Sequence, residues 1–148
     1  MFTDEAEHAA LVEAWLDRVG PLDPAQLVAV FERALSALWR RAEVTLGEVT
    51  LTAIVDRVLY TTAETHPFLS TLKIDERGVC FDAFRQVRVG HADLTDAVHL
   101  VLVEFLRVLG HLTDEILTPA LHAELSKITP AGPGAMGGND DGAQGPRS

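Results

Sequence analysis

Residues 98–112 (VHLVLVEFLRVLGHL) constrain the fold more than any other segment, because they are apolar on almost every side. At about 100° per residue, the polar side chains of this region form one narrow stripe on a helix, which Leu100 and Val103 interrupt. The stripe consists of Asp96, Glu104, Arg107 and His111. Such a helix must be surrounded, either by helices of the same chain or by its copy in a second subunit. The sequence therefore predicts a helix over about 93–111 at the centre of a helical domain.

Four other segments carry apolar side chains at helical spacing. The expected helices cover residues 3–19, 24 to about 41, 45–65 and 114–126. Asp23 followed by Pro24 is typical of an N-cap and a first helical residue. Thr45 and Glu48 have the spacing of a capping box, which predicts that the third helix begins there. Pro67 ends that helix, since a residue before proline is displaced from helical angles.

Between residues 70 and 83 the apolar period changes from that of a helix to that of a strand. Leu72 and Ile74 alternate with polar residues, and the turn sequence Asp-Glu-Arg-Gly follows at 75–78. This pattern predicts a short β-hairpin. A lone hairpin is marginally stable in water, so we expect it to pack on the helices.

The last residues, 130–148, differ in composition from the rest of the chain. They hold six of the eleven glycines and three of the seven prolines. Such a segment cannot bury enough apolar surface to offset the entropy lost on ordering, which predicts a disordered tail. The expected organisation is one helical domain over 1–129, bundle-like and mainly α, with about five helices and one short hairpin.

The acidic composition excludes several classes of partner. The formal net charge is −10, with only 12 Lys plus Arg among 148 residues. Nucleic acids and anionic membranes bind proteins largely through basic side chains, so neither is an expected partner. No apolar run reaches the roughly 18 residues of a membrane span, and the acidic start MFTDEAEH does not resemble a secretory signal. The expected location is the cytoplasm.

The sequence offers no spacing typical of catalysis or metal binding. The single cysteine, Cys80, excludes an internal disulfide framework and a cysteine-clustered zinc site. No two of the six histidines stand three or four residues apart, the spacing that would place two metal ligands on one helix face. Phosphate-binding loops and nucleophile elbows are also missing from the sequence. We therefore expect no catalytic residue, no metal and no cofactor.

One stretch has a family-like pattern. Residues 104–121 read EFLRVLGHLTDEILTPAL, with Glu115, Thr118 and Pro119 in Glu-x-x-Thr-Pro spacing. This stretch resembles the phosphoacceptor helix of sensor histidine kinases, in which a His-Glu pair precedes Thr-Pro. Here Asp114 occupies the place of the phosphorylated histidine, and His111 stands three residues earlier. A local explanation also exists, because Thr and Pro together can cap and restart a helix.

The resemblance implies a role in signalling rather than kinase activity. A kinase also needs a nucleotide-binding domain with Asn- and Gly-rich boxes, which this chain lacks. In those kinases the helix belongs to a dimeric four-helix bundle, which agrees with an apolar helix that needs a partner. His111 is the candidate phosphoacceptor. We expect a homodimer with these candidate interface residues: Leu100, Val103, Glu104, Arg107, Leu117 and Leu121.

Three functions remain compatible with the sequence. The preferred one is a non-enzymatic signalling or regulatory module that self-associates and binds another protein, in a system of the two-component kind. The first alternative is a histidine phosphotransfer or degenerate histidine-kinase-like protein. The second alternative is a sensor domain that binds a small ligand or haem in its helical core.

Overall fold

The computed structural model describes residues 4–20, 22–75 and 78–128. This part of the chain forms five helices and one antiparallel hairpin, which confirms the mainly α fold. The helices are α1 (Asp4–Val19), α2 (Pro24–Leu46), α3 (Glu48–Ala63), α4 (His91–Leu112) and α5 (Thr118–Ser126). Strands β1 (Lys73–Asp75) and β2 (Gly78–Cys80) lie between two 3₁₀ turns, η1 (Pro67–Thr71) and η2 (Phe84–Gln86). The expected disordered tail, 130–148, lies outside the described residues.

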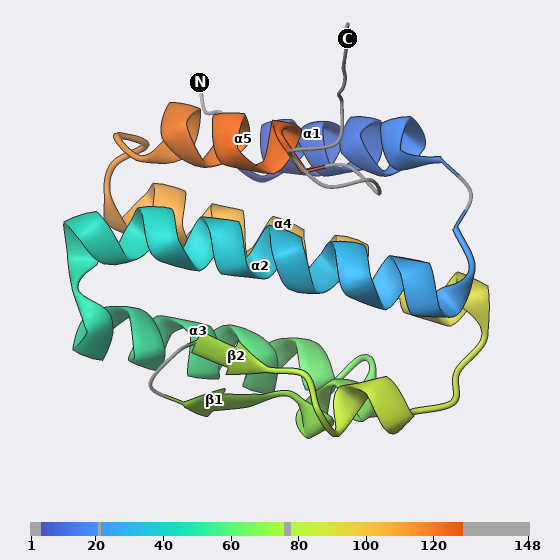
Figure 1. Cartoon of the computed structure of the whole chain (residues 1–148). Helices are drawn as coiled ribbons and strands as arrows, with labels where there is room; N and C mark the ends of the chain where they lie inside the picture. The colour runs from blue at the N-terminus through green and yellow to red at the C-terminus, as the bar shows by residue number, and fades with distance from the viewer. Residues whose placement is uncertain (1–3, 21, 76–77, 129–148) are drawn as a thin grey trace, which may run out of the picture.

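The helices lie side by side in three layers (Figure 1). Helices α1 and α5 form the first layer, α2 and α4 the second, and α3 with the hairpin the third. Helix α4 contacts α1, α2, α3 and α5, so it is the centre of the bundle. The prediction that this helix must be surrounded is met within one chain.

The burial of α4 corrects the expected dimer contact. Val103 is buried in the core of the chain, and Leu100 is half-buried. Leu117 and Leu121 are buried as well. These side chains pack within the bundle, in which α4 contacts α1, α2, α3 and α5. The four aliphatics therefore do not form an exposed row, and that part of the interface prediction is wrong.

The predicted start of α2 is confirmed by its cap, whereas the predicted start of α3 is wrong. The Asp23 side chain accepts a hydrogen bond from the backbone N–H of Gln26 at 2.8 Å, and the backbone N–H of Asp23 donates one to Gln26 Oε1 at 3.1 Å, which confirms the start of α2. Thr45 does not begin α3; it belongs to α2, which continues to Leu46. Gly47, with φ of 84°, makes the turn between the two helices, because glycine adopts positive φ without steric cost.

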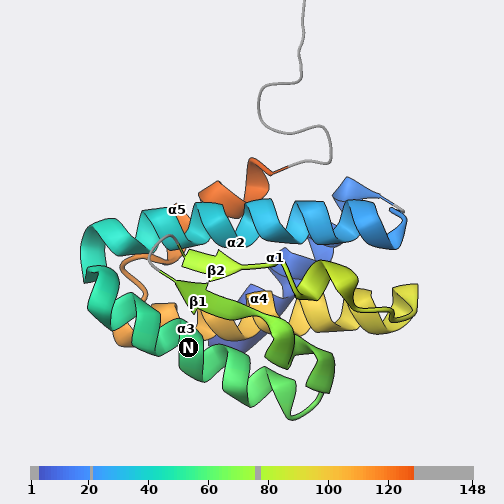
Figure 2. The same cartoon turned by 60° about the horizontal axis from the view of Figure 1, so that its bottom comes forward.

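The hairpin packs on the helices, as expected (Figure 2). Gly78 has a φ of 121°, and a Cβ at this position would lie 3.6 Å from the Trp39 ring of α2. Beyond β2, the rings of Phe81 and Phe84 contact Phe31 of α2 edge to face, at 5.5 and 6.1 Å between centroids. The segment that follows the hairpin thereby closes one side of the core with aromatic side chains.

Candidate functional site

A groove between α3 and α4 brings together three of the predicted site residues. Its volume is about 810 Å³. Glu104, Arg107 and His111 line it from α4. The two helices run in opposite directions in adjacent layers (Figure 1). The other lining residues are Val108 and Leu112 of α4 and Ala53, Ile54, Asp56, Arg57, Val58, Tyr60 and Thr61 of α3.

Charges of both signs line this α3–α4 groove. Arg107 donates two hydrogen bonds to Glu104, from Nη2 to Oε2 at 2.6 Å and from Nε to Oε1 at 3.1 Å. The two residues stand three positions apart on α4, so their side chains meet on one face of the helix. Asp56 and Arg57 add one charge of each sign on α3. The groove thus has balanced charge although the chain is strongly acidic.

Apolar side chains stand at the edges of the groove. Tyr60 on α3 is 73% exposed and Leu112 on α4 is 58% exposed. His111 is also exposed, in the last turn of α4. An exposed aromatic and an exposed aliphatic beside this hollow offer apolar contacts to a molecule that binds there.

The α3 half of this groove was not predicted from the sequence. Helix α3 was recognised only by its buried stripe, which contains Leu51, Ile54, Val55, Val58 and Leu59. Tyr60 lies outside that stripe, and a large aromatic there is the signal that could have identified the surface. Its neighbour across the groove, however, depends on how α3 packs against α4, which no local pattern specifies.

A second cluster of polar side chains joins α1 to α5. His8 is fully buried, and its Nδ1 lies 3.0 Å from Nε2 of His122. Glu115 Oε1 lies 3.8 Å from Nε2 of His8 and accepts a hydrogen bond from the Thr118 hydroxyl. Gly110 permits this approach, because a Cβ there would lie 2.8 Å from the Glu115 carboxylate. The cluster fixes the α4–α5 connection against α1.

This cluster predicts a pH-dependent stability. Burial and the neighbouring His8 lower the pKa of His122, while Glu7 and Glu115 act in the opposite direction. Between the lowered pKa of His122 in the fold and about 6.5, the ordinary pKa of histidine, the unfolded chain therefore binds more protons than the folded one. We expect the free energy of unfolding to fall as the pH is lowered through that value.

Urea unfolding at pH 7.5 and 5.5 measures this effect in wild type and in His122→Gln. The variant should lose less stability than wild type over this interval, because it removes the group that must be deprotonated in the fold. The exposed His91 supplies the control, His91→Gln, which should retain the wild-type pH dependence. An equal pH dependence in all three proteins would contradict the assignment to His122.

The stretch that resembles a phosphoacceptor helix is divided in the structure. Helix α4 ends at Leu112, and α5 begins at Thr118. Asp114 and Glu115 lie between them with φ of 54° and 65°, outside the helical region. Thr118 is the first residue of α5, but its hydroxyl bonds to Glu115 rather than capping the helix, so the predicted cap is wrong. The Glu-x-x-Thr spacing therefore builds the buried cluster at this turn.

Over residues 4–20, 22–75 and 78–128, no three His, Cys, Asp or Glu side chains are grouped to hold a metal ion. None of the helices in these ranges has the length and apolarity needed to cross a bilayer. Comparison of the chain with family models, curated proteins and solved structures finds no match.

Proposed function

We propose that the protein is a non-enzymatic regulatory interaction module that self-associates and binds another protein. The observation that carries this proposal is the α3–α4 groove, with exposed Tyr60 and Leu112 at its edges. We assign the homodimer contact to this groove. This assignment retains Glu104 and Arg107 from the predicted interface. It leaves out the predicted aliphatic side chains, because they pack within the bundle.

The charge pattern supports contact between two copies. In a two-fold dimer the same patch meets itself, so each charged residue must find an opposite charge on an identical surface. The groove carries Asp56 and Glu104 together with Arg57 and Arg107, which satisfies this condition. Two antiparallel helices from each copy would form a four-helix arrangement, the kind of dimer that the histidine-kinase resemblance implies.

Replacing Leu112 by Asp should weaken the dimer. Burying an aliphatic side chain contributes about 1.5–3 kcal/mol, and the two-fold axis counts it twice. We therefore expect the dimer dissociation constant to rise by at least about 100-fold. Sedimentation equilibrium over a range of concentrations measures this constant.

Val44→Asp is the matched control for this experiment. Val44 is 78% exposed on α2 and lies outside the α3–α4 groove. Its replacement should leave the dissociation constant unchanged. A wild-type protein that remains monomeric at tens of micromolar would overturn self-association. Equal weakening by both substitutions would overturn the assignment to the groove.

The phosphotransfer alternative rests on His111. Its side chain is exposed at the edge of the groove, so a donor could reach it. This function requires an acid-labile phosphate on His111 after incubation with a phosphoryl donor. Mass spectrometry of the wild type and of His111→Gln distinguishes it from the interaction module, which needs no phosphate.

A further inference from the structure

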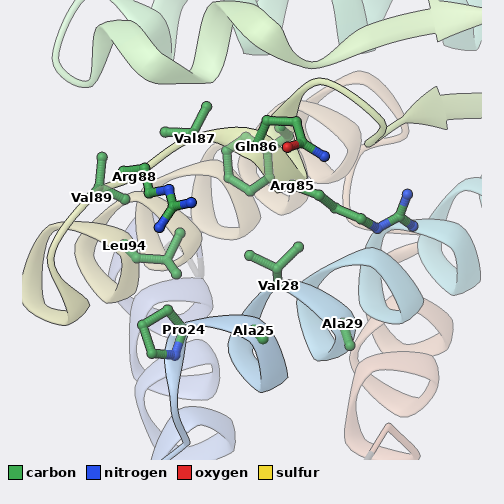
Figure 3. Close-up of a pocket in the computed structure, with 11 residues that line it drawn as sticks. Pro24, Ala25, Val28, Ala29, Arg85, Gln86, Val87, Arg88, Val89 and Leu94 are labelled. Atoms are coloured by element: carbon green, nitrogen blue, oxygen red, sulfur yellow. The ribbon is translucent and has the colours of Figure 1, made fainter.

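A second cavity lies on α2, away from the α3–α4 groove. Its volume is about 660 Å³, within the range of small-molecule sites. The start of α2 forms one wall, and the segment 84–89 before α4 forms the other (Figure 3). Val28, Phe84, Val89 and Leu94 are among the apolar side chains that line it. The cavity can therefore hold the apolar part of a ligand.

Two arginines reach this cavity, but they differ in their partners. Arg85 is paired with Glu32 and with Asp82, which also raise its pKa. Its side chain extends away along α2 in Figure 3. Arg88 is exposed and forms no ion pair within the described residues. Its guanidinium lies over the same opening as Val28 and Leu94 (Figure 3).

We propose that this cavity binds a small amphipathic monocarboxylate, such as a medium-chain fatty acid. The apolar walls would hold the hydrocarbon chain, and Arg88 would bind the carboxylate. A guanidinium presents two parallel N–H donors that match the two oxygens of a carboxylate. An uncharged ligand would leave Arg88 without a partner, and a ligand of higher charge would meet the apolar walls. A single carboxylate on an apolar chain satisfies both parts of the cavity.

The proposed ligand site is independent of the proposed contact between two copies of the chain. The cavity shares no lining residue with the α3–α4 groove. A substitution at Arg88 should therefore leave the dimer dissociation constant unchanged. The ligand experiment and the dimer experiment can therefore fail independently of each other.

Titration with decanoate tests the proposal. We expect decanoate to shift the methyl resonances of Val28, Val89 and Leu94 in the NMR spectrum of the wild-type protein. Arg88→Gln should weaken decanoate binding by at least tenfold, because one charge-assisted contact is lost. Decanol has the same chain without the charge, and its binding should be weaker and equal in the two proteins.

Two further variants complete the experiment. Arg40→Gln removes an exposed arginine of α2 that does not line the cavity, and it should bind decanoate like wild type. Val28→Trp should fill the cavity and abolish the methyl shifts at Val89 and Leu94. Absence of shifts in wild type would overturn the ligand site. Equal binding of decanoate by wild type and Arg88→Gln, or shifts unaffected by Val28→Trp, would overturn the assigned contacts.

Discussion

Leu102→Asp should leave the chain unfolded at 25 °C. Leu102 is fully buried on α4. This helix contacts α1, α2, α3 and α5. The change removes about 1.5–3 kcal/mol of burial and places a carboxylate among apolar side chains, which costs several kcal/mol more. A domain of this size is stable by only about 5–15 kcal/mol. Far-UV circular dichroism and urea unfolding measure the outcome.

Val49→Asp is the control for this substitution. Val49 is 85% exposed near the start of α3, where a negative charge is favourable to the helix. Its replacement should change the free energy of unfolding by no more than about 0.5 kcal/mol. A Leu102→Asp protein with wild-type helix content and a cooperative unfolding transition would contradict the central position of α4.

Trp15→Ala should destabilise the domain by about 3–5 kcal/mol, as expected for removing a large buried aromatic. Trp15 is fully buried on α1, and its Nε1 donates a hydrogen bond to the carbonyl of Ile128 at 3.0 Å. The indole therefore fixes the chain after α5 to α1. Chemical unfolding monitored by circular dichroism gives the change in free energy.

Trp15→Phe separates the packing of this side chain from its hydrogen bond. Phenylalanine retains much of the buried ring but leaves the Ile128 carbonyl without its donor, which costs about 1–3 kcal/mol. The expected order of stability is wild type, then Trp15→Phe, then Trp15→Ala. A Phe variant as stable as wild type would show that the hydrogen bond contributes nothing.

The fold could be predicted from the sequence because its signals are local. The Asp23 cap and the helical spacing of apolar residues depend only on neighbours along the chain. The prediction failed where two local signals competed. Thr45 and Glu48 have capping-box spacing, but Gly47 supplies the positive φ that the turn uses, so α2 continues to Leu46.

The candidate site could be predicted only in part, because it depends on which helices pack together. The place of Glu104, Arg107 and His111 on one face of α4 followed from its polar stripe. The burial of Val103 did not, because it depends on how the neighbouring helices pack against α4 in the tertiary structure. Likewise, the pairing of His8 with His122 joins residues from opposite ends of the domain, which spacing along the chain cannot reveal.

A distance measurement between two copies tests the α3–α4 assignment most directly. Thr61 is exposed in the groove, and a single nitroxide label at Thr61→Cys, in a Cys80→Ser background, reports only on distances between chains. Pulsed electron–electron double resonance should show a defined distance between the two nitroxide labels of the dimer. The same label with Leu112→Asp should lose that distance at the same concentration. A protein without any dipolar signal, or with a signal that Leu112→Asp leaves unchanged, would contradict self-association through the groove.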